Sequence, residues 1–250
     1  MNAINASNKG LAASAAAFLG ASLALGTLPA EAGLFSVTPV RIYMTTRDRA
    51  TAVTVTNEGD TEIVMQADIF DWKQKADGSE DLKLSEDLIL APPIVKLAPR
   101  SSQVLRLALT RPQPTAEQLT YRLVVREVPE VKLPEKGLQL QIALAFSLPV
   151  FITPAGAKRQ LICGIERGAA NQLRAVCENA GSAYAQPVEF ALSGTGGMLA
   201  SRDTGGYILP NMKRSFDLIG TAGRLPAGKA TLTVTQDDAS KQTFDVMLAD

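Results

Sequence analysis

Residues 138–150 alternate without interruption between large apolar side chains and small or polar ones. Successive side chains of a β-strand point to opposite faces, so the pattern predicts one strand, roughly 40 Å long, with one apolar face. Leaving that face in water would forfeit on the order of 10 to 20 kcal/mol, as much as the net stability of a domain. Either the chain itself or a partner must therefore cover it. The large apolar residues are Leu138, Leu140, Ile142, Leu144, Phe146, Leu148 and Val150.

The first 32 residues have the composition of a secretory signal peptide. Lys9 is the only charged residue before an alanine- and leucine-rich run over residues 11–28, and a small-x-small cleavage site ends at Ala32. For a membrane anchor, which is the alternative, the run is short and rich in alanine. We expect cleavage after Ala32 to leave an exported chain, residues 33–250. That chain has no further run of ~20 apolar residues and hence no integral membrane segment.

Charge and histidine content exclude several classes of function. Lysine plus arginine and aspartate plus glutamate each number 25, which argues against a nucleic-acid-binding surface. The chain has no histidine, which excludes Ser-His-Asp and Cys-His catalysis and histidine-ligated metal sites. We expect no catalytic residues, no cofactor and no metal ion. Carboxylate or lysine chemistry remains conceivable, with Asp68 and Asp71, or Glu80 and Asp81, as candidate carboxylate pairs.

The two cysteines, Cys163 and Cys177, flank a turn-like segment at residues 168–171. A hairpin that folds there sets them opposite one another, and an exported compartment would oxidise the pair. Closing this loop of about 15 residues would add roughly 3 kcal/mol of stability on a chain-entropy estimate. Two reduced, buried thiols remain the alternative, because no spacing enforces the bond. A redox role is disfavoured because the C-x-x-C spacing is absent.

Short strand patterns separated by turn residues continue through the rest of the chain. Seven expected strands in the first ~120 residues of the mature chain are typical of an immunoglobulin-like sandwich. Residues 153–156 contain proline and glycine and predict a hinge. The expected fold class is all-β, with two immunoglobulin-like β-sandwich domains over residues 33–153 and 154–250. The expected strands cover residues 35–43, 50–56, 63–72, 94–97, 103–109, 119–128 and 138–150, then 188–192, 216–219, 230–234 and 243–248.

Five sequence pieces follow one another over most of residues 34–156. They are TPVRIYM from Thr38, TVTNEGDTEIVMQADIFDW ending at Trp72, APPIVKLAPRSSQVLRL from Ala91, EQLTYRLVVREVP from Glu117, and LQLQIALAFSLPVFITP ending at Pro154. In this order and with these separations they resemble the periplasmic chaperones of the chaperone/usher pilus pathway, the PapD-like family. The Ser-Leu-Pro-Val-Phe ending is most similar to the archaic, Csu-type branch. The second half resembles the family only in length, strand pattern and position.

The resemblance implies a function that needs no enzyme activity. It implies a boomerang of two immunoglobulin-like domains that caps pilus or fimbrial subunits in the periplasm and hands them to an outer-membrane usher. Such subunits lack their final strand, and the chaperone lends its own strand to the exposed groove by donor-strand complementation. An exposed edge would also favour self-association of the free chaperone.

The resemblance also implies the residues of the site. Arg41 matches an arginine that grips the C-terminal carboxylate of the subunit and so fixes the register of the donor strand; its alternative is a solvated arginine on a strand edge. Glu117 matches an acidic residue that helps to fix the interdomain angle, unless it is simply a turn residue. The alternating run falls where the family places its donor strand. The expected pocket fillers are Leu140, Ile142, Leu144 and Phe146, with Leu138 and Leu148 as extensions.

Two positions depart from the family pattern. Pro149 stands where many members have a lysine that pairs with the anchoring arginine, and Thr153 stands where an arginine is expected before the terminal proline. A second anchoring cation must therefore come from elsewhere or be absent. The candidate substitutes are Lys158, Arg159, Arg122 and Arg126.

Two other functions compete with that of a chaperone. An exported adhesion or carbohydrate-binding module of two β-sandwiches would cover the long strand within its own fold and would need no client. An exported hydrolase would use the paired carboxylates, but nothing in the sequence separates those residues from solvated strand ends and turns. The leading interpretation is the non-enzymatic chaperone.

Overall fold

The structure is a computed structural model, and its described residues form one compact unit. The described ranges are 34–48, 50–75, 77–110, 115–129, 142–168, 172–221 and 227–248. The expected signal peptide at residues 1–32 lies outside these ranges, as do Leu138 and Leu140 of the expected donor strand. Within the described ranges the chain is built from strands, turns and irregular segments, and no helix is long and apolar enough to cross a membrane. The predicted all-β class is confirmed.

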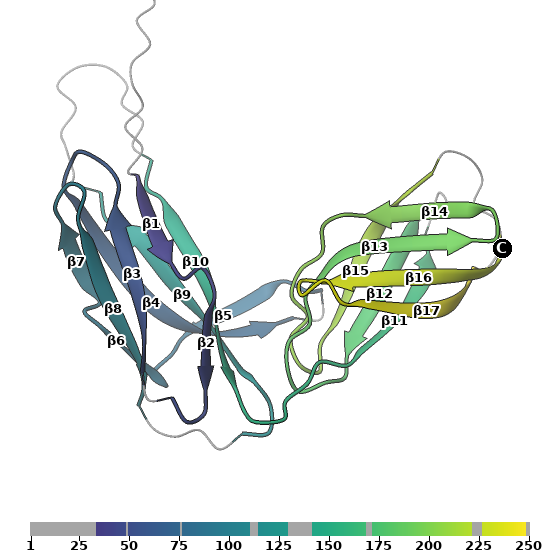
Figure 1. Cartoon of the computed structure of the whole chain (residues 1–250), viewed down its shortest axis with the longest axis horizontal. Helices are drawn as coiled ribbons and strands as arrows, with labels where there is room; N and C mark the ends of the chain where they lie inside the picture. Colours follow the sequence, from purple (N-terminus) through teal and green to yellow (C-terminus); the bar gives the residue numbers. More distant parts are fainter. Residues whose placement is uncertain are drawn as a thin grey trace, which may run out of the picture. The chain divides into compact units, whose positions relative to one another are not determined.

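The first sandwich consists of two sheets, with strands coloured purple to teal in Figure 1. One sheet has the order β1-β3-β8-β6, and the other has the order β2-β10-β9-β4-β5, with β7 paired to β4. The strands are β1 (Phe35–Thr38), β2 (Ile42–Thr45), β3 (Ala50–Asn57), β4 (Ile63–Gln74), β5 (Glu80–Leu84), β6 (Leu88–Ala91), β7 (Ile94–Leu97), β8 (Ser102–Leu109), β9 (Leu119–Glu127) and β10 (Ala145–Thr153).

The second sandwich is a seven-stranded sheet that folds back on itself. Its order is β11-β12-β15-β14-β13-β16-β17, and β11 packs against β17, so the sheet encloses a core around Phe190 and Phe216. The division into domains at Thr153 stays a prediction. The strands are β11 (Leu161–Arg167), β12 (Leu173–Asn179), β13 (Pro187–Gly194), β14 (Gly197–Arg202), β15 (Lys213–Gly220), β16 (Gly228–Gln236) and β17 (Lys241–Leu248).

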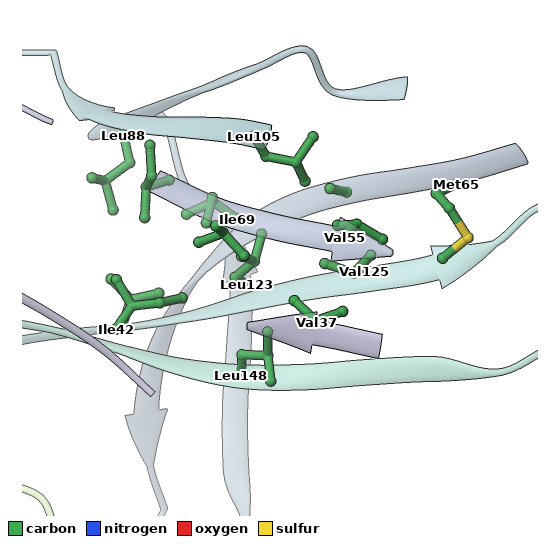
Figure 2. Close-up of a cluster of buried hydrophobic side chains, with 14 of the residues drawn as sticks. Val37, Ile42, Val55, Met65, Ile69, Leu88, Leu105, Leu123, Val125 and Leu148 are labelled. Carbon is green, nitrogen blue, oxygen red and sulfur yellow. The ribbon is translucent and has the colours of Figure 1, made fainter. Parts of the chain in front are cut away.

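The core of the first sandwich follows from the two-residue period of its strands. β9 lies between β4 and β10, and its alternate residues Tyr121, Leu123 and Val125 are buried. Full burial of an aliphatic side chain of this size stabilises the fold by about 1.5 to 3 kcal/mol. Figure 2 shows Leu123 and Val125 among the core side chains contributed by both sheets.

The expected strand at residues 35–43 is divided at Pro39. β1 pairs with β3 in one sheet, whereas β2 pairs with β10 in the other, so the chain changes sheets between them. A proline has no N–H group to continue a ladder, which favours this break. The change of sheet places Arg41 directly before β2. Strands β5, β6 and β14 were not predicted, because each is short and carries charged or weakly alternating residues.

Candidate functional site

Among the described residues, the N-terminal half of β10 has one edge without a strand partner, which we call the open edge. Residues 145–152 pair antiparallel with β9, but on the other side β2 pairs only with residues 150–153. Figure 1 shows β10 between these two neighbours. Among the described residues, the backbone of residues 145–149 therefore has no strand partner on that side. Unpaired N–H and C=O groups along such an edge can accept a further strand.

Three predicted donor residues lie exposed beside this edge. Ile142, Leu144 and Phe146 expose 48%, 37% and 40% of their surfaces. The ring of Phe146 packs edge-on against Phe35, with their centroids 5.0 Å apart, so this end of the group is held against β1. We call Ile142, Leu144 and Phe146 the apolar ridge.

Leu148 does not continue the apolar ridge. It is 5% exposed and belongs to the first core, where Figure 2 shows it among the labelled side chains. In this conformation its side chain is not available to a partner. The strand expected over residues 138–150 also begins later than predicted within the described residues. β10 starts at Ala145, and residues 142–144 lie outside any strand.

Beyond Leu148 both faces of β10 are buried. Val150 and Ile152 face the first core, whereas Phe151 lies in a separate cluster. Its ring stacks on that of Tyr184 from the second sandwich, with the centroids 4.1 Å apart. This contact explains why the alternation of β10 no longer separates a buried face from an exposed one. We call the rings of Tyr43, Trp72, Phe151, Tyr184 and Tyr207 the aromatic cluster.

Polar groups surround the aromatic cluster. The hydroxyl oxygens of Tyr43 and Tyr184 share a hydrogen bond of 2.8 Å. Burial raises the pKa of Tyr184 and of Tyr207, which favours the neutral form of both phenols. The guanidinium of Arg122 lies 3.8 Å from the centre of the Trp72 ring, a cation–π contact largely removed from water.

Arg41 lies where the open edge of β10 ends. The next residue, Ile42, pairs with Val150, so Arg41 occupies the register position of Pro149. β2 therefore covers the edge from Val150 onward, and the uncovered stretch, residues 145–149, ends beside Arg41. The anchoring role of Arg41 stays a prediction.

The Arg41 side chain is held by the second sandwich. Its Nη1 donates a hydrogen bond of 2.7 Å to Oδ2 of Asp237, and its Cζ lies 5.9 Å from the centre of the Tyr207 ring. Burial alone lowers the pKa of the Arg41 guanidinium, but its contacts with Tyr43 and Asp237 outweigh burial and raise that pKa. Arg41 is thus a permanent cation, and a carboxylate of the same chain already contacts it.

Three of the four candidate second cations form ion pairs within the chain. Arg122 lies directly opposite Pro149 in the β9–β10 ladder. Lys158 is exposed and has no ion pair among the described residues. The ion pairs are Arg122 with Glu80, Arg126 with Asp68, and Arg159 with Asp238.

Glu117 and its neighbour Gln118 contact the second sandwich. Nδ2 of Asn211 donates a hydrogen bond of 2.8 Å to Oε1 of Glu117. The buried Gln118 donates from Nε2 to Oγ1 of Thr153 at 2.7 Å and accepts at Oε1 from the backbone N–H of Tyr184 at 2.9 Å. The interdomain role of Glu117 stays a prediction. Sequence reasoning missed Gln118, whose only signal is a polar residue directly before an apolar strand.

The predicted disulfide is present. Cys163 of β11 pairs with Cys177 of β12 in the antiparallel register, their Cα atoms lie 4.1 Å apart, and their sulfur atoms are bonded. The hairpin prediction placed the two residues opposite one another, and the structure confirms the bond over the alternative of two reduced thiols.

The carboxylates considered for hydrolysis do not form pairs. Asp68 and Asp71 are three residues apart on β4, and Glu80 and Asp81 are adjacent on β5, so the members of each pair point to opposite faces of a strand. Within the described ranges, no three acidic, cysteine or histidine side chains lie close enough together to hold a metal ion.

The described residues thus form two β-sandwiches of immunoglobulin-like type, with Arg41 beside the edge of β10 that has no strand partner among them. The family described as "Pili and flagellar-assembly chaperone, PapD N-terminal domain" matches residues 34–158. The chain belongs to this family of pilus chaperones. The expectation drawn from the five sequence pieces is thereby confirmed.

One curated protein and several solved structures are similar to this chain. The chaperone protein FimB/FhaD of Bordetella pertussis is 29% identical over 146 residues, which span 56% of this chain and 59% of that protein. A chain of the CsuC–CsuE chaperone–tip adhesion subunit pre-assembly complex from the archaic Csu pili of Acinetobacter baumannii shares the fold, with 20% identity and a TM-score of 0.64. This similarity covers 87% of the present chain and 100% of that chain. The E. coli chaperone DraB has 20% identity, a TM-score of 0.56, and coverage of 87% and 97%.

Proposed function

We propose that this protein is a periplasmic chaperone that stabilises pilus subunits by donor-strand complementation and delivers them to an outer-membrane usher. The observation that carries the proposal is the apolar ridge beside the unpaired edge of β10. A β-sandwich that lacks its last strand needs both backbone hydrogen bonds and apolar side chains in its groove, and this segment offers both. The Csu relative was solved in complex with a tip adhesion subunit, which supports a pilus subunit as the client.

Arg41 would fix where the client strand ends. β2 runs parallel to β10 and occupies the same edge beyond residue 149. A client strand bound to residues 145–149 with its carboxyl end at Arg41 would therefore also run parallel to β10. A guanidinium can make two parallel charged hydrogen bonds to one carboxylate, and a slip of one residue would turn every donor side chain away from the groove.

The ridge would contribute a moderate part of the binding energy. Each of its side chains exposes between about a third and a half of its surface. Burying that remainder is worth roughly 1 kcal/mol per side chain, or about 3 kcal/mol for the ridge. Backbone hydrogen bonds along the edge, and the predicted donor residues Leu138 and Leu140, would add to this contribution.

The remaining predictions belong to the same proposal. Export through the N-terminal 32 residues would bring the chain to a compartment in which disulfides persist, consistent with the Cys163–Cys177 bond. The presence of two separate hydrophobic cores supports a division into domains of residues 33–153 and 154–250. In the absence of a client, the open edge would allow self-association.

The test is rescue of a pilus subunit from the same organism by co-expression. The wild-type chain should yield a soluble one-to-one complex. The double variant Ile142→Asp plus Leu144→Asp should remain folded, because both side chains are partly exposed and lie outside a strand, but it should lose the complex. Buried charges without partners in the client groove would cost several kcal/mol, more than the ridge contributes.

A matched control changes two exposed apolar residues away from the edge. Ile162→Asp plus Ile219→Asp alters side chains of the second sandwich that are 55% and 77% exposed, and it should leave the complex intact. A folded wild-type chain that rescues no subunit would instead favour the adhesion or carbohydrate-binding module. Equal binding by the Ile142/Leu144 variant would remove the donor role from the ridge.

A further inference from the structure

The anchoring site of the proposed function is already neutralised. Arg41, the cation at the end of the open edge, is in contact with Asp237 at 2.7 Å. Pro149 supplies no second cation, and Arg122 opposite it is paired with Glu80. An incoming carboxylate therefore meets balanced charges instead of an excess of positive charge.

Asp237 is presented to Arg41 by a well-held turn. It follows β16 directly, and its backbone N–H donates to the carbonyl of Gln186 at 3.0 Å. The Asp237 side chain is 13% exposed, compared with 34% for that of Arg41. The second sandwich thus places a carboxylate at the point where the open edge of β10 ends.

We propose that Asp237 is an internal stand-in for a chain-terminal carboxylate, and that a client strand must displace it from Arg41 to complete its docking. The inference rests on the proposed function, since it concerns the regulation of the same site. Only Nη1 of Arg41 contacts Asp237, so the pair lacks the two parallel hydrogen bonds that a guanidinium can form. A client carboxylate that makes both bonds would compete favourably for Arg41.

Sharing of Arg41 by the two carboxylates is the less favourable arrangement. Two negative groups on one guanidinium repel each other, and Pro149 carries no charge that could balance the second carboxylate. Displacement instead keeps one anion on one cation. Displacement also makes the Arg41 site selective for strands. A free carboxylate that replaces Asp237 gains little binding energy, whereas the carboxylate of a strand that pairs with β10 also gains the backbone hydrogen bonds of the edge.

The test compares one peptide with two different ends. A fluorescein-labelled heptapeptide of alternating valine and serine carries a free C-terminal carboxylate or a C-terminal amide, and its binding to the purified protein is followed by fluorescence anisotropy. Asp237→Asn removes the competing charge with almost no change in shape. It should tighten binding of the carboxylate peptide about three- to tenfold and leave the amide peptide unchanged.

Two control variants place the effect on Arg41. Asp238→Asn makes the same charge change in the same turn but affects the Arg159 ion pair, and it should change neither peptide. Arg41→Gln in the Asp237→Asn background should abolish the gain. Asp237→Ser tests the same prediction with a second side chain if the asparagine variant folds poorly, and near-ultraviolet circular dichroism reports the fold of each variant.

The opposite results would overturn the inference. Weaker binding of the carboxylate peptide by Asp237→Asn would mean that Asp237 orients Arg41 for the client. Unchanged binding, or no carboxylate-specific binding by that variant, would mean that freeing Arg41 creates no anion site. The proposed function is tested separately, by subunit rescue with the Ile142/Leu144 variant. A negative result in the peptide comparison therefore overturns the role of Asp237 and not the proposed function.

Discussion

Two phenylalanines of the same strand should separate stability from function. Phe151 is fully buried in the aromatic cluster, whereas Phe146 is 40% exposed on the apolar ridge. Phe151→Ala should lower the free energy of unfolding by about 3 to 5 kcal/mol, the usual cost of emptying a buried phenylalanine site. Phe146→Ala removes a side chain that is about three-fifths buried. It should cost only about 1 to 2 kcal/mol.

Urea unfolding followed by tryptophan fluorescence measures this difference. Trp72 is the only tryptophan of the chain, and its ring centre lies 6.0 Å from that of Phe151, so the signal reports on the affected cluster. Subunit rescue by co-expression supplies the second readout. Once its urea curve shows that it is folded, Phe146→Ala should rescue less subunit than wild type in co-expression, because one side chain of the ridge is lost.

Equal destabilisation by the two substitutions would refute the reasoning, because it would mean that Phe146 is as deeply packed as Phe151. A loss below about 1 kcal/mol for Phe151→Ala would show that the cluster collapses around the missing ring. Full subunit rescue by a folded Phe146→Ala variant would show that the ridge does not need its aromatic member.

Three further measurements test the disulfide, the Gln118 contacts and the buried tyrosines. Replacing Cys163 and Cys177 by alanine should lower stability by about 3 kcal/mol, measured as a lower urea midpoint, and an unchanged midpoint would contradict the loop-closure argument. Gln118→Ala leaves the Tyr184 N–H without its acceptor and should cost about 1 to 3 kcal/mol in thermal or urea unfolding; a neutral effect would show that water replaces the amide. Alkaline titration at 295 nm should show three phenols ionising later than free tyrosine, because burial raises their pKa. A raised pKa means that folding favours the neutral phenol, so these groups stabilise the fold fully below about pH 10, and this stabilisation is lost as pH rises through the folded-state pKa. Titration of all four tyrosines together near pH 10 would contradict this. The three phenols are those of Tyr121, Tyr184 and Tyr207.

Local patterns were sufficient for most of the long strands. The alternation at residues 63–72 and 103–109 predicted β4 and β8 to within two residues, because the side-chain period of a strand is visible in the sequence. The hairpin between Cys163 and Cys177 was found for a similar reason, since the midpoint of the pair falls in a turn. The edge strand β5 was missed because its exposed charged residues carry no burial pattern.

Partners distant in sequence were outside the reach of such patterns. Arg41 stood out through its motif, but its contact with Asp237 joins residues 196 positions apart. Gln118 had no motif of its own, and its bridging role follows only from the positions of Thr153 and Tyr184. Nothing local in the chain specifies which carboxylate reaches which arginine.

The sequence by itself determined the all-β class, the disulfide hairpin and the alternating segment that must be covered. Only the tertiary structure decided where that segment changes its role. Phe146 and Leu148 have the same place in the alternation, yet Leu148 is packed in the first core and Phe146 is partly exposed. Alternation assigns side chains to a face of a strand, but burial depends on what covers that face, and other strands cover only part of β10.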